Sequence, residues 1–367
     1  MSKVLLGEVS HERKETCKGS KEGYPIVGLE HLIPEEITLT TWDEGAENTF
    51  TKMFRKGDVL FGRRRAYLKK AAVAPFDGIC SGDITVIEAD PDKILPELLP
   101  FIIQNDDLFD FAVGKSAGSL SPRVKWEHLK NYELELPDMD KQKELAELLW
   151  AIDDTKKSYQ KLIAATDELV KSQFMEQFKE LINSPEACSK IEDECTVFAD
   201  GDWIESKDQS DEGIRLIQTG NIGNAQYLDK GERARYITED TFNRLNCTEV
   251  KANDILISRL PDPVGRACII PEGLGKCITA VDCTIVRLRS RILPEYFIAY
   301  TLSPFYMMQV AARETGSTRK RISRKNLGIL KIPVPQIAEQ ESFASIVRQS
   351  DKSLRKESKV VQTKKQY

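Results

Sequence analysis

Histidine is scarce in this chain, and the spacings that bind metal are missing with it. There are three histidines among 367 residues, and none of the eight cysteines forms a Cys-x-x-Cys pair. Because such pairs are the usual basis of a zinc site, no metal site is predicted, and reduced thiols in a cytoplasmic protein are the simpler expectation. The apolar runs are too short to span a bilayer, and no signal-peptide pattern follows the first residues.

Motifs for nucleotide binding and catalysis are also missing. No Gly-x-Gly-x-x-Gly, His-Glu-x-x-His or nucleophile elbow occurs. Val113-Gly114-Lys115-Ser116 resembles the end of a P-loop, but Phe109 stands where that motif needs its first glycine. A loose nuclease pattern at Pro137-Asp138 has its second part, Asp154-Thr155-Lys156, in the middle of a predicted helix. The sequence therefore predicts a recognition protein rather than an enzyme.

The chain contains an internal repeat. Ile94-Leu95-Pro96-Glu97 recurs 198 positions later as Ile292-Leu293-Pro294-Glu295, and the same shift aligns Gly118-Ser119 with Gly316-Ser317. A period near 200 residues is too long for a solenoid, whose repeats are about 20–50 residues. The repeat predicts a duplicated pair of domains.

Each copy predicts a mixed α/β domain followed by a long helix. Short apolar, β-branched runs bounded by Gly, Pro and Asp are typical of strands. These runs are Pro25–Leu29, Asp58–Phe61, Ile84–Ile87 and Tyr132–Leu136 in the first copy, and Ile214–Ile217, Ile255–Ile257, Cys283–Leu288 and Leu330–Val334 in the second. The predicted boundaries are 1–136 and 183–334 for the domains, and 137–182 and 335–367 for the helices.

The long helices are predicted from apolar stripes. Apolar side chains recur at helical spacings, and the first stripe predicts about forty helical residues, or about 60 Å at 1.5 Å per residue. They include Leu145, Leu148, Ile152, Tyr159 and Leu162 in the first helix, and Phe343, Ile346 and Val347 in the second. An apolar helix face needs a partner, so the two helices are predicted to pack on each other. Two independent dimerisation helices are the alternative.

Basic clusters in both copies indicate a DNA partner, although the net charge of the chain is −5. The field at a binding surface depends on local charge. Arginine forks and hydroxyl groups beside a glycine suit phosphate oxygens. The candidates are Arg63, Arg64, Arg65, Lys69, Ser119 and Arg123 in the first copy, and Ser317, Thr318, Arg319, Lys320 and Arg321 in the second. A solvated surface loop is the alternative for each cluster, and the recurrence of Gly-Ser favours DNA.

Four further residues are candidates for reading bases. Gln218 and Asn221 follow a strand and carry amide groups that can pair with adenine. A turn that closes the strand explains them equally well. Arg259 and Arg266 flank Pro261-Asp262-Pro263 and are candidates on the same grounds.

Several phrases resemble one protein family. They are Gly201-Asp202-Trp203-Ile204, the run from Arg215 to Ile222, the run from Lys251 to Arg259, and the stretch from Gly316 to Pro335. With the duplicated plan, nearly the whole chain resembles the specificity subunit of type I restriction–modification systems, which serve in phage defence. The resemblance implies an α+β fold with two similar target-recognition domains, separated by two long helices that form an antiparallel coiled coil.

The resemblance also implies a function. Each domain would read one half of a bipartite, asymmetric site in double-stranded DNA, and the helices would set the gap. Two modification (methyltransferase) subunits would dock on the helices, and restriction (translocase/nuclease) subunits would join them. No cofactor is expected in this chain; S-adenosylmethionine, ATP and Mg belong to the partners, and no membrane is involved. The rival hypotheses are a coiled-coil scaffold with two ligand-binding domains and no DNA, and an enzyme with a metal site among its acidic residues.

Overall fold

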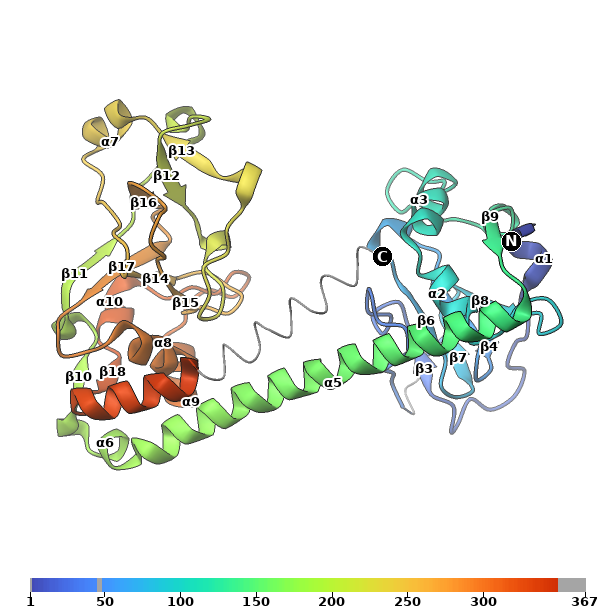
Figure 1. The fold of residues 1–367 in the computed structure, drawn as a ribbon, viewed down its shortest axis with the longest axis horizontal. Helices are drawn as coiled ribbons and strands as arrows, with labels where there is room; N and C mark the ends of the chain where they lie inside the picture. Colours follow the sequence, from blue (N-terminus) through green and yellow to red (C-terminus); the bar gives the residue numbers. More distant parts are fainter. Residues whose placement is uncertain (1, 45–47, 349–367) are drawn as a thin grey trace. The chain divides into compact units, whose positions relative to one another are not determined.

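The computed structural model describes residues 2–44 and 48–348 of the chain. The chain divides into two compact units, residues 1–158 and 159–367, and each is described by itself. Strands and helices are mixed in both units (Figure 1), as the sequence predicts. The last part of the predicted second long helix, 349–367, lies outside the described residues.

Unit 1 is built on a four-stranded antiparallel sheet in the order β2-β8-β5-β6. A three-stranded sheet, β3-β7-β4, and a two-stranded sheet, β1-β9, accompany it. The strands are β1 (Ser2–Leu5), β2 (Ser10–Glu12), β3 (Ile26–Val27), β4 (Lys52–Phe54), β5 (Val59–Gly62), β6 (Ala71–Val73), β7 (Gly78–Cys80), β8 (Ile84–Ala89) and β9 (Glu133–Leu136). The helices are α1 (Leu6–Val9), η1 (Ala66–Leu68), α2 (Leu99–Ile103), α3 (Asp106–Gly114), α4 (Trp126–Leu129) and the start of α5 (Met139–Gln177).

The central strand β5 is buried on both faces, which explains its unbroken apolar sequence. Val59 and Phe61 point into the core formed with the helices, while Leu60 points into the core formed with the three-stranded sheet. Successive side chains of a strand face opposite ways, so a strand covered on both sides has no polar positions. Its counterpart in unit 2 repeats this alternation, with Ile255 and Ile257 on one face and Leu256 on the other.

Unit 2 has the same elements in nearly the same order. Its sheets are β11-β17-β14-β15, β13-β12-β16 and β10-β18. The strands are β10 (Cys188–Lys190), β11 (Cys195–Asp200), β12 (Ile214–Ile217), β13 (Arg235–Ile237), β14 (Ile255–Ser258), β15 (Ala267–Ile269), β16 (Cys277–Thr279), β17 (Cys283–Leu288) and β18 (Lys331–Pro333). The helices are α6 (Lys179–Asn183), α7 (Glu239–Leu245), α8 (Pro294–Leu302), α9 (Pro304–Ala311) and α10 (Arg324–Gly328), with short 3-10 turns η2 (Pro185–Ala187), η3 (Glu192–Glu194), η4 (Ser206–Asp208), η5 (Thr219–Asn221) and η6 (Gly231–Arg233).

The two copies differ in their three-stranded sheets. The parallel pair β3-β7 of unit 1 corresponds to β12-β16 of unit 2. The third strand joins this pair on opposite edges, because β4 pairs with β7 whereas β13 pairs with β12. Where one copy has the full strand the other keeps a single bridge, Val250 to Cys277 in unit 2 and Ile26 to Asp43 in unit 1. The repeat is therefore close around the central sheet and divergent at this second sheet.

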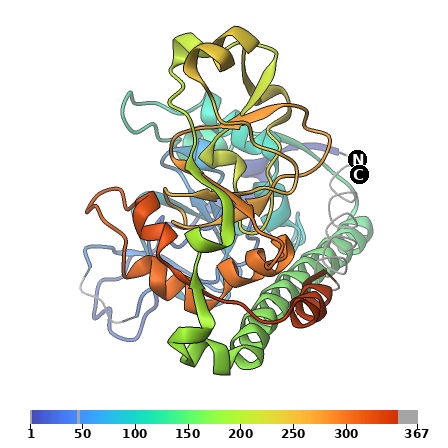
Figure 2. The same ribbon diagram turned by 90° about the vertical axis from the view of Figure 1, so that its left-hand side faces the viewer.

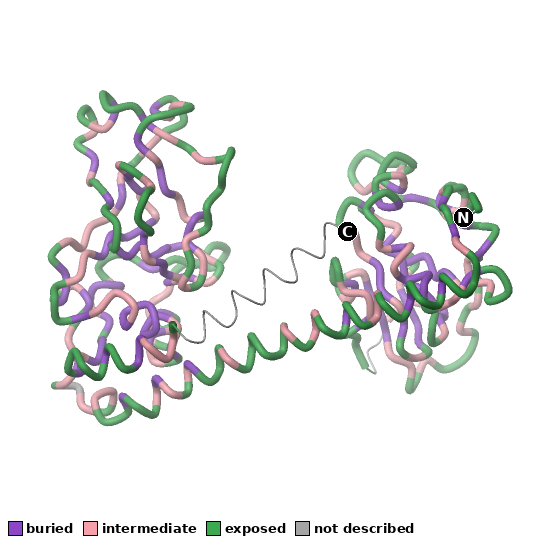
Figure 3. Tube along the Cα trace, in the orientation of Figure 1, coloured by how far each residue is buried: buried purple, intermediate pink, exposed green. Residues whose placement is uncertain are grey.

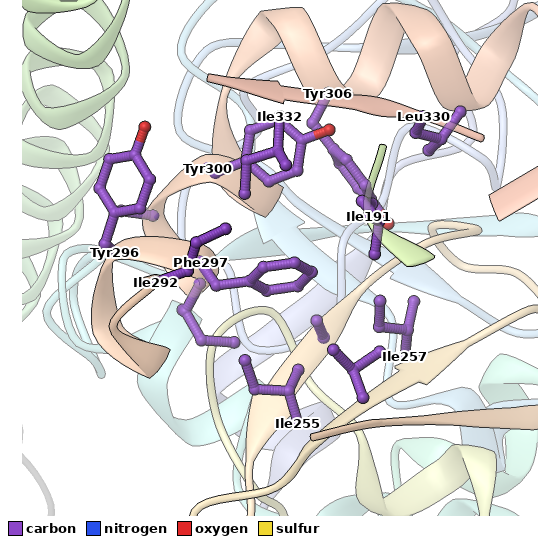
Figure 4. Close-up of a cluster of buried hydrophobic side chains, with 14 of the residues drawn as sticks. Ile191, Ile255, Ile257, Ile292, Tyr296, Phe297, Tyr300, Tyr306, Leu330 and Ile332 are labelled. Atoms are coloured by element: carbon purple, nitrogen blue, oxygen red, sulfur yellow. The ribbon is translucent and has the colours of Figure 1, made fainter. Parts of the chain in front are cut away.

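Aromatic side chains hold the end of α5 in unit 2. Phe174 and Phe178 are buried, and their ring centroids lie 5.8 Å and 5.3 Å from that of Tyr296 on α8. Phe343, on a helix over residues 337–348, lies 5.5 Å from Phe174 and 5.6 Å from Phe178. That helix lies beside the last turns of α5 and runs in the opposite direction (Figures 1 and 2). The same core continues through Tyr300 to strands β14 and β18 (Figure 4).

A buried glutamine joins each domain to its helix in the same way. Leu95 N–H donates to Gln142 Oε1 at 2.9 Å, and Leu293 N–H donates to Gln340 Oε1 at 2.9 Å. The Nε2 group of Gln142 donates to the carbonyl of Pro137, and that of Gln340 to the carbonyls of Pro335 and Arg291. Both glutamines are almost fully buried. These bonds fix the first turn of the helix onto the Leu-Pro-Glu segment of its own domain.

Candidate nucleic-acid interface

The Gly-Ser segments of the two copies fold into matching loops. Ala117 and Arg123 exchange both backbone hydrogen bonds, at 3.0 and 2.9 Å, and Thr315 and Arg321 exchange theirs at 2.9 Å each. Gly118 and Gly316 open the loops with φ of +114° and +97°, a region that favours glycine. At Gly316 a Cβ atom would also lie 2.5 Å from the carbonyl oxygen of Arg319. Both loops therefore require glycine at this position.

Each loop is fastened to the end of the central strand. In unit 1, Arg63 N–H donates to the carbonyl of Asp83, and Val124 N–H donates back to the carbonyl of Arg63. In unit 2, Arg259 N–H donates to Asp282, and Ile322 N–H donates to Arg259. The loops consequently leave the same end of the four-stranded sheet in both domains. Because the loops recur in space as well as in sequence, they support a shared role in the two domains more strongly than the sequence repeat alone does.

An arginine–aspartate pair closes each loop at its base. Arg123 Nε lies 2.7 Å from Asp83 Oδ1, and Arg321 Nη2 lies 3.3 Å from Asp282 Oδ1. Arg64 Nη1 also reaches Asp83, at 3.3 Å. The hydrogen bond from Arg123, with that from Arg64, lowers the pKa of Asp83 below its ordinary value. These arginines therefore serve first to shape the loop, with their charge partly neutralised.

The remaining predicted residues of the basic clusters are exposed except for Arg63 and Lys69, which are half-buried. Arg65 is exposed and carries a positive φ, and Lys69 forms an ion pair with Asp106. Arg319 is exposed and, within the described part of the chain, forms no ion pair, whereas Lys320 is paired with Glu314 at 3.1 Å. Ser119, Ser317 and Thr318 are exposed at the loop tips. Both tips thus present hydroxyl groups to solvent, and the tip in unit 2 adds the cations Arg319 and Lys320, which suits phosphate oxygens.

Arg259 and Arg266 have roles that the sequence did not predict. Arg259 is 5% exposed, and its Nε lies 3.4 Å from Asp200. The guanidinium of Arg266 donates to four backbone carbonyls, those of Thr219, Ile222, Leu260 and Pro263, at 2.7 to 3.1 Å. Burial lowers the pKa of Arg266, although an arginine so held stays charged. Both guanidinium groups are engaged by the protein and hold irregular segments together.

Gln218 and Asn221 form the turn that was the alternative to base reading. Gln218 N–H donates to Asn221 Oδ1 at 3.0 Å, and Asn221 Nδ2 donates to the carbonyl of Leu228. Asn221 is buried. In unit 1 the same turn is closed by an imidazole, because Gly28 N–H donates to His31 Nδ1 at 2.9 Å. Asn221 therefore stabilises the turn, while the side chain of Gln218 lines a pocket beside it.

This pocket gathers basic residues that sequence reasoning missed. It has a volume of about 250 Å³. Its basic lining consists of Arg215, Lys230, Arg233 and Arg235. The signal available in the sequence was the run from Lys230 to Arg235, which holds three basic residues in six positions. The sequence alone could not place Arg215 beside this run, because the two segments meet only through the pairing of β12 with β13.

The predicted docking positions on the helices separate into exposed and buried sets. Leu145, Leu148, Ile152 and Leu162 are between 37% and 57% exposed on α5, and Tyr159 is half-buried. Phe343 is fully buried, and Ile346 and Val347 are half-buried, on the helix over 337–348. Figure 3 shows α5 as mostly exposed, and its exposed apolar positions extend from Leu145 to Leu169, whereas Val170 and Phe174 in its last turns belong to the core of unit 2.

Two other findings concern the described residues. None of the helices there is both long and apolar enough to cross a bilayer. Within 2–44 and 48–348, no three His, Cys, Asp or Glu side chains are grouped so as to hold a metal ion.

Comparison with known proteins identifies one family. Residues 6–165 and 187–362 match the family described as the type I restriction modification DNA specificity domain. The protein described as the type I restriction enzyme MjaX specificity subunit of Methanocaldococcus jannaschii is 22% identical over 361 residues, covering 92% of this chain and 83% of that protein. The MjaVIII specificity subunit of the same organism is 20% identical over 346 residues, covering 89% and 75%.

Solved structures share the fold. The type I restriction–modification S subunit from M. genitalium aligns with a TM-score of 0.54 and 13% identity, covering 99% of this chain and 92% of that one. A chain from a structure concerned with complex assembly and conformational transition of the type I R-M system aligns with a TM-score of 0.51 and 19% identity, covering 100% and 94%. At these identities the likeness concerns the fold alone.

Proposed function

This chain belongs to the type I restriction–modification DNA specificity family, and from that premise we propose that it is the sequence-specific DNA-binding subunit of a type I restriction–modification complex. Each globular domain reads one half of a two-part asymmetric site in double-stranded DNA. The long helices set the gap between the halves and dock two modification subunits. The observation that supports this most is the glycine loop with exposed hydroxyl groups, which is built twice and fastened to the same sheet end in both domains, and which carries exposed basic residues at its tip in unit 2.

The proposal assigns the chemistry to the partner subunits. Methyl transfer needs S-adenosylmethionine, and translocation with cleavage needs ATP and magnesium; all three are placed in the modification and restriction subunits, in the cytoplasm. This chain then contributes affinity, sequence choice and spacing. The exposed apolar side chains Leu145, Leu148 and Ile152 are the positions we assign to partner docking.

The test of this function is co-expression with the modification subunit of the same organism, followed by methylation-sensitive sequencing of the host DNA. We expect methyladenine at one two-part motif with a fixed gap. A stable complex without any methylated motif would contradict the specificity role. The scaffold alternative predicts, in addition, that the purified chain binds no duplex in a salt-dependent manner, since counterion release accompanies phosphate contacts.

Two matched variants test the loops themselves. Arg65→Gln and Arg319→Gln each remove one exposed charge from a loop region, one per domain. Each variant should weaken binding to the methylated motif and lower the slope of log K against log salt concentration by about 0.9, the value for one phosphate contact. The motif itself should be unchanged, because phosphate contacts carry no base information. An altered motif would instead assign the arginine to base reading.

A further inference from the structure

The basic pocket of unit 2 has the composition of an anion site. Besides its four basic residues it is lined by the uncharged polar residues Gln218, Thr219 and Asn221 and by Leu216, Gly220 and Ala234. None of the described residues that line it is acidic. Four cationic side chains around about 250 Å³, of which Arg215 is compensated by Asp229, give the pocket a positive potential. The pocket therefore favours an anion.

Two of the four cations are held by neighbours and two are available. Arg215 is paired with Asp229 and lies over the ring of Tyr227, 5.9 Å from its centroid. Arg235 donates to Gln209. For Lys230 and Arg233, the described part of the chain provides no hydrogen bond or ion pair to the charged groups. Their charges are left for a group from outside the chain.

The turn at the rim of the pocket is open and rigid. Gly220 is exposed, and a Cβ atom there would lie 3.7 Å from Nζ of Lys230. A Cβ atom would therefore make an ordinary contact with the lysine side chain, and glycine leaves this space open. From the inside, Arg266 holds the turn by its bonds to the carbonyls of Thr219 and Ile222. A turn held in this way is ordered before a ligand arrives, which reduces the cost of binding.

The matching turn of unit 1 carries an acidic side chain where unit 2 has glycine. The bond from Gly28 to His31 is equivalent to the bond from Gln218 to Asn221, because each closes its turn over three residues. Glu30 therefore occupies the position that Gly220 has in unit 2. The carboxylate of Glu30 fills the space beside Gly28, where a Cβ atom would lie 2.2 Å from its Oε1. This turn thus combines a carboxylate with the ammonium group of Lys70, which donates to the carbonyl of Leu29, and lacks the excess of positive charge found in unit 2. The anion site is therefore a feature of unit 2 and not of the repeat.

We propose that this pocket binds a phosphodiester group of the DNA backbone and anchors the second domain on its half-site. The inference rests on the proposed function and adds a site to it. A phosphate fits better than a base edge, because Lys230 offers a point charge without the directional pattern that base recognition requires. In DNA the backbone phosphates are also the groups that proteins contact most often. Lys230 and Arg233 make the contact, Gly220 leaves room for the strand, and Arg215 adds charge from the pocket wall.

The test uses the full chain in complex with its modification subunits and a labelled duplex that carries the motif found by methylation sequencing. Binding of wild type and of the Lys230→Gln, Arg233→Gln double variant is measured over a series of KCl concentrations. We expect at least about tenfold weaker binding at 0.1 M salt, and a salt slope smaller by about 1.8, the sum for two phosphate contacts. The control is Lys251→Gln, which removes an exposed charge of the same domain outside the pocket. It should bind like wild type.

A conservative variant separates charge from structure. Lys230→Arg with Arg233→Lys keeps both charges and should restore most of the affinity, while all variants should melt at the same temperature. An unchanged salt slope in the double glutamine variant would overturn the phosphate site. So would a changed base preference in the second half-site, which would make the pocket a base reader. If wild type itself shows no salt-dependent binding, the proposed function fails rather than the pocket.

Discussion

Replacing Gln340 with alanine should be among the most costly single changes in this chain. The side chain is fully buried and serves three backbone groups: it accepts from Leu293 N–H at 2.9 Å and donates to the carbonyls of Arg291 and Pro335 at 2.8 and 2.9 Å. Each buried polar group left without a partner costs about 1–3 kcal/mol. Three such groups, with some access of water to the cavity, give a loss of about 3 kcal/mol in the free energy of unfolding.

The equivalent residue of unit 1 provides an internal comparison. Gln142 serves two backbone groups, those of Leu95 and Pro137, so Gln142→Ala should cost about 2 kcal/mol. Gln177→Ala, at an exposed position of α5, is the control and should change stability by less than about 0.5 kcal/mol. Urea unfolding followed by circular dichroism measures all three, and hydrogen exchange at the Leu293 amide reports the local effect. Losses below about 0.5 kcal/mol at both buried glutamines would refute the reasoning.

A third substitution at this position tests the roles of the two amide atoms. Gln340→Glu keeps an acceptor for Leu293 N–H but turns a carboxylate toward two carbonyl oxygens. Burial and this repulsion raise the pKa of the new carboxyl in the folded state. The variant should therefore lose most stability relative to wild type above that raised pKa, and recover as pH falls and the carboxyl regains a proton to donate. Equal stability of the variant and wild type at pH 8 would contradict this account.

Three further predictions concern single groups. Burial raises the pKa of seven cysteine thiols, to about 12 for Cys80, so only half-buried Cys17 should react quickly with a thiol reagent in the native state, and all eight should react in urea. Arg123 lowers the pKa of Asp83, so their pair contributes fully above the ordinary aspartate pKa and is lost as pH falls through the lowered value; Asp83→Asn should cost about 1 kcal/mol at pH 6 in thermal melts, and this cost should shrink progressively as pH falls below the ordinary aspartate pKa. Arg266→Met should cost about 3 kcal/mol in urea unfolding, because four carbonyls lose their donor; a loss below about 1 kcal/mol would show that water replaces it.

Much of the architecture could be predicted from local pattern. The predicted strand Asp58–Phe61 corresponds to β5, Val59–Gly62, and the helix expected to run about forty residues has 39. These elements are determined by residues close in sequence: continuous apolar runs for strands buried on both faces, and a helical stripe without Gly or Pro. The Gly-Ser loops were found for the same reason, since a glycine at positive φ and its neighbours define a loop by themselves.

What the sequence could not give depends on contacts between distant segments. Arg266 follows a Pro-Asp-Pro run and resembles a surface residue, but its guanidinium satisfies carbonyls of the distant turn at Thr219 and Ile222 as well as of its own loop. The third strands β4 and β13 have three residues each and join their sheets at opposite edges, which no local pattern distinguishes. The basic pocket needs Arg215 and Lys230 to meet across a strand pair.

The pairing of the first strand of each domain with its last has a consequence for how such a chain can arise. β1 pairs with β9, and β10 pairs with β18, so each domain begins and finishes at the same place. A domain whose first and last strands pair can be duplicated in tandem without disrupting its core. It can also be exchanged for a homologous domain, because the new domain needs only the same pair of terminal strands. The polypeptide therefore enters and leaves such a domain at adjacent points. The different edges at which β4 and β13 join the three-stranded sheets show where the two copies diverged while the pairing of their terminal strands was kept.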